Sequence, residues 1–214
     1  MAQLEGDVVH PDPSIAAESH VPDPDALRAE ALADPAAFWA DRARELEWFK
    51  PWDRVVDDSN APFFRWFTGA EVNIVHNCLD RHVTGPNKNK LALIWQSEDG
   101  KEHRTFSYFS LNRQVNQMAN VLKAMGVVKG DRVTIYLPRI PEVFFAMLAC
   151  AKIGAVHSVI FAGFSADALT DRIDDSKSKL VITADGSWIN GSVFPLKDIV
   201  DKAVKFSPTI ENVI

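Results

Sequence analysis

The sequence predicts an α/β protein, in which a helical and aromatic-rich N-terminal segment packs on a doubly wound, mostly parallel sheet of β-α-β-α-β order. Two observations support this prediction. From residue 132 onwards, short apolar runs typical of buried strands alternate with helical patterns, as a parallel sheet requires. Four of the six tryptophans lie before residue 68, outside that alternation, and indicate a separate N-terminal segment.

The stretch from 132 to 165 predicts a strand, a helix, a second strand and a loop. Val133 to Leu137 is a short apolar run that a proline ends. Pro141 is tolerated in a first helical turn, and Gly154 is a natural left-handed helix end. Val156 to Phe161 returns as a strand parallel to the first. The loop after it lies at the carboxyl end of a strand, where such sheets bind ligands.

Prolines and capping residues organise the first third of the chain. Residues 1–24 are expected to be a mobile arm with little regular structure, because prolines stand among small and acidic residues. Asp25 to Lys50 reads as two helices, the second beginning at Asp34 and ending before Pro51. An aromatic loop follows, and Asn73 to Val83 is a short helix. Its inward residues are expected to be Ile74, Val75, Cys78 and Leu79.

The aromatic segment, residues 39–67, has two interpretations. An exposed cluster could be a platform for a ligand, or its rings could let an irregular segment pack on a larger body. Packing is the interpretation that we favour. We therefore assign residues 25–83 to one unit and residues 84–214 to the start of a second.

The remaining elements follow one another at regular spacing. Turn residues predict a hairpin around Asp99-Gly100, and apolar residues at helical spacing predict an amphipathic helix that ends at Gly126. The elements expected after the N-cap Ser165 are a helix to about Asp175, a strand at Leu180 to Thr183, a turn at Asp185-Gly186, a helix at Leu196 to Val204 and a strand from Glu211. A parallel strand needs neighbours, so we expect an incomplete portion of a larger domain.

Composition narrows the classes of partner. The chain has 214 residues, a formal net charge of -6 and a pI of about 5.5. This acidic balance argues against nucleic acid or an anionic membrane as the main partner, because both need clustered lysine and arginine. No apolar run reaches the length of a membrane helix and no signal-peptide pattern is present, so a cytoplasmic location is expected.

The usual catalytic and metal-binding patterns are missing from the sequence. Cys78 and Cys150 have no metal-ligand spacing, and we expect both to be buried thiols. The six histidines are scattered, and His157 alternates with apolar neighbours as a structural histidine would. We therefore predict neither a catalytic residue nor a metal site in this chain.

Five separated motifs carry a family resemblance. They are Asp34-Pro35-Ala36-Ala37-Phe38-Trp39, Trp48-Phe49-Lys50-Pro51-Trp52, Phe64-Arg65-Trp66-Phe67, Asn77-Cys78-Leu79-Asp80-Arg81-His82, and the long run from Met147 to Ser165. In this order, from about Asp25 to the last residue, they resemble AMP-forming acetyl-CoA synthetases. The wider acyl-adenylate-forming superfamily shares the fold without the aromatic segment.

The resemblance implies a two-step ligase. A small carboxylate attacks the α-phosphorus of ATP, with Mg²⁺, to give an acyl-adenylate and pyrophosphate, and the CoA thiol then displaces AMP. Residues 84–214 are the first part of the AMP-binding domain by this resemblance, while the phosphate loop and the adenylation lysine lie beyond Ile214. The chain alone is therefore expected to be inactive. The alternatives are a ligase for propionate or a similar acid, and a non-catalytic truncated scaffold or binding module.

The resemblance places a first CoA contact in the loop of Phe161, Ala162 and Gly163, against the CoA adenine. An aromatic face beside small residues lets a base approach closely. A structural interpretation stays open beside it, in which Gly163 only permits a tight turn and Phe161 packs in the core.

The resemblance places a second CoA element in the loop from Trp188 to Ser192. The family carries two arginines there that engage CoA phosphates, and in this chain their positions hold Ile189 and Ser192, on either side of Asn190 and Gly191. Isoleucine cannot replace a charge-assisted guanidinium contact. The phosphates would then be met by Lys197 or by residues outside this chain, or CoA would bind more weakly or in another geometry. A different acyl substrate is a further possibility.

Overall fold

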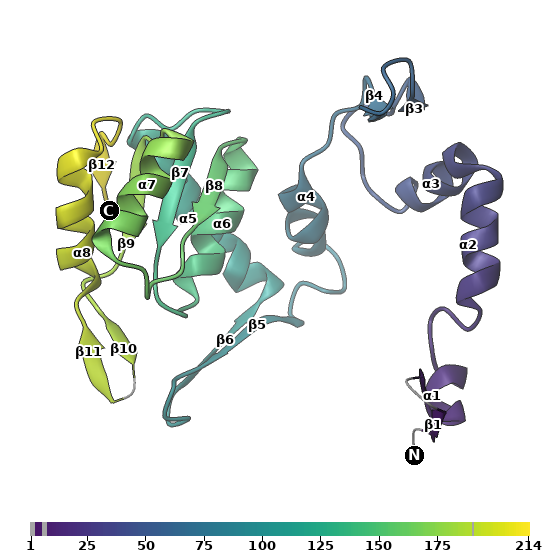
Figure 1. The fold of residues 1–214 in the computed structure, drawn as a ribbon, viewed down its shortest axis with the longest axis horizontal. Coiled ribbons are helices and arrows are strands. Elements are labelled where there is room, and N and C mark those ends of the chain that lie inside the picture. Colours follow the sequence, from purple (N-terminus) through teal and green to yellow (C-terminus); the bar gives the residue numbers. More distant parts are fainter. Residues whose placement is uncertain (1–2, 6–7, 190) are drawn as a thin grey trace. The chain divides into compact units, whose positions relative to one another are not determined.

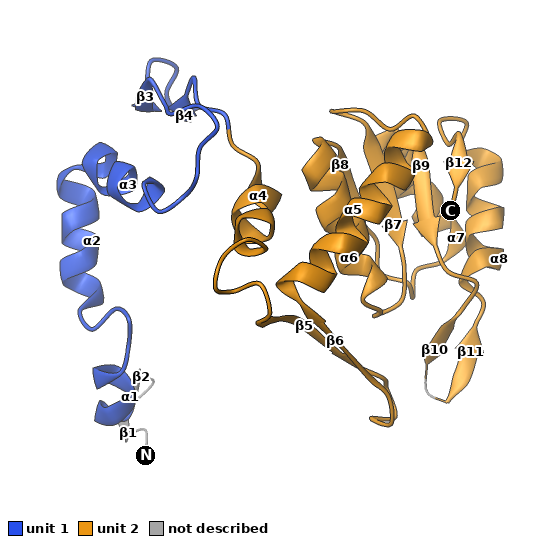
Figure 2. Cartoon of the chain, turned by 180° about the vertical axis from the view of Figure 1, so that it is seen from behind, with its two compact units in different colours: residues 1–71 blue, residues 72–214 orange. Residues whose placement is uncertain are grey.

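The computed structural model describes residues 3–5, 8–189 and 191–214. The chain forms two compact units, residues 1–71 and residues 72–214 (Figure 2). The packing of the aromatic segment on the sheet stays a prediction. No helix among the described residues is both long enough and apolar enough to cross a lipid bilayer.

Aspartate-proline pairs begin the helices of the first unit. Each helix has proline in its first turn and an aspartate N-cap, whose carboxylate accepts a backbone N–H. The elements of this unit are β1 (Gln3–Glu5), β2 (Val8–His10), α1 (Pro13–Ala17), α2 (Pro24–Ala33), α3 (Pro35–Ala43), β3 (Arg54–Asp57) and β4 (Arg65–Thr68). The expectation of little regular structure before residue 24 is wrong, because β1 and β2 pair antiparallel and because Asp12 and Pro13 together supply the start of α1.

The aromatic segment is not the loop that the sequence predicted. Strands β3 and β4 pair antiparallel, with Val56 opposite Trp66. Beside this hairpin, the ring of Trp48 packs on those of Trp52 and Phe67, with centroids 5.2 and 5.3 Å apart. The aromatic side chains therefore pack on one another, and this mutual packing stabilises a hairpin that the sequence pattern alone left irregular.

The second unit is a parallel sheet with helices on both faces (Figure 1). Its elements are α4 (Ile74–Cys78), the 3₁₀ turn η1 (Asp80–His82), β5 (Leu91–Gln96), β6 (His103–Ser107), α5 (Tyr108–Ala124), β7 (Arg132–Tyr136), α6 (Glu142–Ile153), β8 (Val156–Val159), α7 (Ala166–Ser176), β9 (Leu180–Thr183), β10 (Ser187–Ile189), β11 (Ser192–Phe194), α8 (Leu196–Ala203), the 3₁₀ turn η2 (Val204–Phe206) and β12 (Asn212–Val213). The strand order is β12-β9-β7-β8, and each neighbouring pair is parallel. The predicted β-α-β succession is confirmed.

Alternate residues of the central strands supply two separate cores. Val133 and Ile135 of β7 pack with α5 and α6 on one face of the sheet. Tyr136 of β7 and Val181 of β9 pack with α7 and α8 on the other. Successive side chains of a strand point to opposite faces, so a strand with a core on each side buries side chains on both faces, including the hydrogen-bonded Thr134 of β7. The sheet is therefore doubly wound, as the sequence predicted.

Helix α4 buries only part of the face that the sequence assigned to it. Val75 and Leu79 are buried, whereas Ile74 is 63% exposed and Cys78 is also exposed. Val75 and Leu79 are four residues apart and form one face, while Ile74 and Cys78 form the next face around the helix. The prediction that both cysteines are buried is therefore wrong for Cys78 and confirmed for Cys150.

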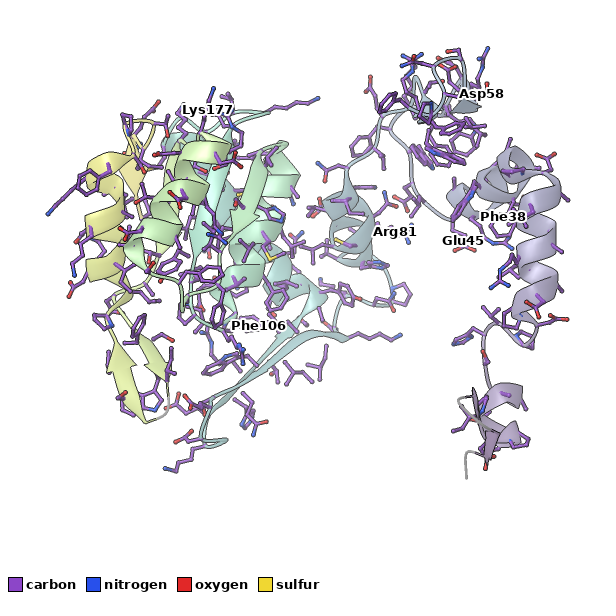
Figure 3. All side chains as sticks on the ribbon, viewed as in Figure 1. Phe38, Glu45, Asp58, Arg81, Phe106 and Lys177 are labelled. Carbon is purple, nitrogen blue, oxygen red and sulfur yellow. The ribbon has the colours of Figure 1, made fainter. Side chains whose placement is uncertain are left out.

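The β5–β6 hairpin and the long helix α5 agree with the sequence. Phe106 of β6 is buried, and its ring packs edge to face on that of Phe145, with centroids 5.3 Å apart (Figure 3). The Trp95 indole N–H donates to the carbonyl of Arg139, 2.7 Å away. These contacts attach the hairpin to α6 and to the loop that follows β7.

Candidate functional site

The candidate site is the carboxyl edge of the parallel sheet. The segments that leave β7, β8 and β9 all emerge at this edge, because the three strands are parallel and adjacent. They are the segment from Leu137, the loop 161–164 and the segment from Ala184. Parallel sheets bind ligands at such an edge, since loops from different strands converge there. Both CoA elements expected from the sequence lie on segments that leave this edge.

The loop 161–164 is a turn whose backbone carbonyls are hydrogen-bonded by a buried tyrosine. The N–H of Phe164 donates to the carbonyl of Phe161, 3.1 Å away, which closes the turn. The Tyr136 hydroxyl oxygen lies 2.7 Å from the Phe164 carbonyl oxygen and 3.1 Å from that of Ala162. Tyr136 is fully buried, and this burial raises the pKa of its hydroxyl, so the proton stays in place to be donated.

The three loop residues named from the sequence have different surroundings. Ala162 is buried, whereas Phe161 is 60% exposed and does not pack in the core. A Cβ atom on Gly163 would lie 2.5 Å from the Phe161 ring, closer than side chains tolerate. Gly163 therefore gives the Phe161 ring room to lie over the loop, and the backbone of Gly163 has no left-handed conformation that would require glycine.

Two further residues complete the aromatic loop: Phe164, which follows Gly163 directly, and Arg172, which the sequence did not indicate. The Phe164 ring meets the Phe161 ring edge to face, with centroids 5.9 Å apart. The guanidinium of Arg172 on α7 lies over Phe164, 4.5 Å from the ring centroid. Sequence spacing gave no signal for Arg172, because its contact with Phe164 connects the loop with the second turn of the helix.

The second element is a β-hairpin, which the sequence analysis did not predict. Strands β10 and β11 pair antiparallel, with Trp188 opposite Val193 and Ile189 opposite Ser192. Gly191 has a φ of +75°, and the Ser192 hydroxyl donates to the carbonyl of Ile189. Asn190 lies outside the described residues. The dipeptide Asn190-Gly191 is a strong hairpin signal that should have identified this turn.

The hairpin presents an apolar surface rather than a charged one. Trp188 is 59% exposed and Val193 is 64% exposed. With Asp185, Gly186, Ser187 and Pro195 they line a shallow depression of about 320 Å³. The amine of Lys197, the replacement cation considered from the sequence, is 2.6 Å from Asp201. A phosphate at this hairpin would have to compete with that carboxylate for Lys197.

The described residues offer no metal centre and no activated thiol at this edge. Among them, no group of three or more His, Cys, Asp and Glu side chains is arranged to hold a metal ion. Burial raises the pKa of the Cys150 thiol to about 12. The pKa of the Cys78 thiol is also raised, because protein atoms displace water from its partly covered sulfur although the residue as a whole is exposed. A thiol with a raised pKa is a poor nucleophile at neutral pH.

The fold defines the class of protein: an α/β domain with a doubly wound parallel sheet, in which loops from adjacent strands leave the carboxyl edge together. Comparison with known proteins defines the family. A model of AMP-binding enzymes matches residues 79–212, and a model of the acetyl-coenzyme A synthetase N-terminus matches residues 25–78. The chain belongs to the AMP-binding enzyme family.

Relatives from several organisms match almost the whole chain. An acetyl-coenzyme A synthetase of Chlorobaculum tepidum is 51% identical over 88% of this chain, and one of Deinococcus radiodurans is 46% identical over 97%. The acetoacetyl-CoA synthetase structure from Streptomyces lividans matches with a TM-score of 0.82 and 30% identity over 94% of this chain. The chain spans 28%, 32% and 31% of these three proteins, respectively.

Proposed function

We propose that the full-length protein containing this chain is an acetate–CoA ligase. It would form acetyl-CoA from acetate, ATP and CoA through an acetyl-adenylate, with release of pyrophosphate and AMP. The observation that carries the proposal is the identity of about 50% to proteins named acetyl-coenzyme A synthetase across almost all of this chain. The AMP-binding match over residues 79–212 supports the adenylate step.

Within this ligase, we assign residues 25–83 to the N-terminal segment and residues 84–214 to the first part of the AMP-binding domain. The boundary between the two matched family models, at residues 78 and 79, supports this division. A cytoplasmic location accords with the absence of a membrane-spanning helix among the described residues. Residues 1–24 are assigned as an arm ahead of both.

The proposed role of this chain is to hold one end of CoA. The exposed ring of Phe161 offers an apolar face to the adenine, and Gly163 keeps the space that this ring needs. Tyr136 fixes the loop carbonyls, so little order has to be gained when CoA binds. ATP and Mg²⁺ supply the activated phosphorus and its charge neutralisation, and the residues that bind them are proposed to lie elsewhere in the protein.

The β10–β11 hairpin is the second proposed CoA contact. Ile189, Gly191 and Ser192 are described and Asn190 is not, and none of the four supplies a cation. In this protein the hairpin would therefore meet CoA through shape and apolar contact with Trp188 and Val193. CoA binding would then depend more strongly on the loop 161–164.

Two half-reactions of the full-length protein test the proposal. Acetate-dependent exchange of pyrophosphate into ATP reports the adenylate, and thioester formation on addition of CoA reports the second step. Both should occur, and this chain expressed alone should support neither. Absence of exchange with every acid tried would refute the ligase and favour a non-catalytic scaffold or binding module.

A separate experiment must identify the carboxylic acid that the proposed ligase prefers. The structure from Streptomyces lividans is an acetoacetyl-CoA synthetase, and it covers 94% of this chain. Exchange should therefore be measured with acetate, propionate and acetoacetate at equal concentrations. We expect the largest kcat/KM with acetate. A larger value with either other acid would retain the ligase and reassign its substrate.

A further inference from the structure

The structure points to Arg172 as a positioning residue for the CoA-contacting loop, an inference that rests on the proposed function. Three contacts in series lead from α7 to the exposed ring. The Arg172 Nη1 donates to the carbonyl of Ala168, 2.9 Å away. The guanidinium lies over Phe164, and Phe164 in turn meets Phe161 edge to face.

The first contact fixes the plane of the guanidinium. Helix α7 begins at the N-cap Ser165, one residue after Phe164, so Ala168 belongs to its first turn. By donating to Ala168, Arg172 lies along that turn and reaches back toward the loop. Arginine suits this geometry because its planar group can donate a hydrogen bond at the edge and stack through the face.

The contact of Arg172 with Phe164, and that of Phe164 with Phe161, restrict the orientation of the Phe161 ring. Phe164 is 37% exposed and Phe161 is 60% exposed, so the core alone does not hold either ring. The cation over Phe164 and the perpendicular packing of the two rings restrict both. Gly163 leaves the Phe161 ring free to take this position, because a side chain at residue 163 would collide with the ring.

Arg172 therefore sets the position of the apolar face that meets the CoA adenine, and its effect should appear in CoA binding alone. Acetate and ATP react before CoA is needed in the proposed mechanism. A change that only displaces the Phe161 ring should leave the pyrophosphate exchange intact. A general loss of folding would instead lower both half-reactions together.

The test is Arg172→Met in the full-length protein, with Arg42→Met as its matched control. Arg42 lies over Phe38 at the same 4.5 Å, within the first unit, and is an exposed arginine as well. Phe38 is labelled in Figure 3. Methionine keeps an unbranched side chain but has neither charge nor planar group. A second variant, Arg172→Lys, keeps the charge and loses the flat stacking surface.

Arg172→Met should raise the KM for CoA about two- to fivefold, the size of one exposed cation–π contact. The exchange rate and the KM for ATP should stay unchanged, Arg172→Lys should be intermediate, and Arg42→Met should match the wild type. An unchanged KM for CoA would overturn the proposal. So would a parallel rise in the KM for ATP with a lower melting temperature, which would mean that Arg172 only stabilises the fold.

Direct binding of CoA by calorimetry separates this proposal from the function on which it rests. If the wild-type protein binds CoA and Arg172→Met binds it equally well, the positioning role fails and the ligase remains. If the wild type binds no CoA and supports no exchange, the proposed function fails, and the role of Arg172 fails with it.

Discussion

The two segments proposed to meet CoA are built in different ways. The loop 161–164 is fixed by contacts with the body of the domain, through the buried Tyr136 hydroxyl and the guanidinium of Arg172. The 187–194 hairpin is held by its own strand pairing and exposes Trp188 and Val193. A change at the buried anchor Tyr136 should therefore lower the stability of the domain, whereas the hairpin should accept substitutions at little cost to stability.

The same difference affects which part of CoA the two segments can recognise. The loop offers a fixed aromatic ring, and a fixed ring costs little ordering when a flat base packs on it. The hairpin itself offers an apolar strand pair and no cation, and a phosphate would have to compete with Asp201 for the nearby Lys197. Recognition at this edge of the sheet should thus depend more on the adenine than on the phosphates. Variants of the two segments can test this conclusion separately.

The largest expected effect comes from Tyr136→Phe. Its hydroxyl serves two loop carbonyls in a buried place, and phenylalanine would leave them without this donor. The free energy of unfolding should fall by about 1–3 kcal/mol, the cost of an unsatisfied buried polar group. Urea denaturation of the full-length protein measures it.

Tyr108→Phe is the matched control, because Tyr108 is the other tyrosine of the chain and is only partly buried. Its variant should keep the wild-type urea midpoint. Equal midpoints for Tyr136→Phe and the wild type would show that the loop does not depend on the tyrosine hydroxyl.

Alkaline pH should weaken the same anchor. Burial raises the pKa of Tyr136 above its ordinary value of 10.0, so the folded state holds the phenolic proton more tightly than the unfolded chain does. The stability that this proton contributes is complete below the unfolded pKa and is lost as the pH rises through the higher folded pKa. Urea midpoints should therefore fall above about pH 10 in the wild type and fall less in Tyr136→Phe. An identical alkaline slope in both proteins would exclude Tyr136 as the source.

Gly163→Val should separate CoA binding from ATP binding. The new Cβ would meet the Phe161 ring at 2.5 Å, and the exposed ring can move away into solvent. We expect the KM for CoA to rise about tenfold, which corresponds to about 1.4 kcal/mol, with a smaller change in the KM for ATP.

Gly85→Val is the control for this substitution. A Cβ at Gly85 would contact only the carbonyl of Arg81, at 4.0 Å, and the backbone there is not left-handed. Its kinetic constants should equal those of the wild type. An equal loss for CoA and ATP in Gly163→Val, with a lower melting temperature, would mean that Gly163 serves the fold alone.

The sequence predicted the sheet better than it predicted the site, for physical reasons. Buried parallel strands are continuous apolar runs, so β7 and β9 could be located from local composition. The arginine over Phe164 depends on how α7 turns back on its own loop, which no local pattern encodes. The hairpin around Gly191 did have a local sequence signal, the dipeptide Asn190-Gly191, which favours a tight turn between two strands.

In the first unit, the sequence-based prediction of an irregular aromatic segment was wrong for a different reason. Prolines and scattered aromatics are typical of loops, and they led to the expectation of an irregular segment. In the structure, ring packing among Trp48, Trp52 and Phe67 accompanies a β3–β4 hairpin. The pairing depends on contacts between residues up to 19 positions apart, as Trp48 and Phe67 are, and a short sequence window does not contain them.

The smallest expected effect is a gain from placing arginines on the 187–194 hairpin. Ile189→Arg with Ser192→Arg puts two guanidinium groups on directly opposed residues, where phosphate oxygens could accept their hydrogen bonds. The dissociation constant for CoA should fall about two- to fivefold at low ionic strength, and salt should remove much of the gain because the pair is exposed. Like charges opposite one another should cost about 0.2–1 kcal/mol of stability. Titration calorimetry with CoA and with dephospho-CoA measures both the gain and its dependence on the 3′-phosphate.

The matched control for these arginines is Ile94→Arg with Thr105→Arg. These two residues are directly opposed in the β5–β6 hairpin, and Ile94 is 64% exposed, so the change in charge and the cross-strand repulsion are the same. This control should bind CoA as the wild type does. A similar gain from both pairs would mean that added positive charge attracts CoA from anywhere on the surface. A gain confined to Ile189 and Ser192 would place a CoA phosphate beside the hairpin and show that the wild-type hairpin lacks only the cations.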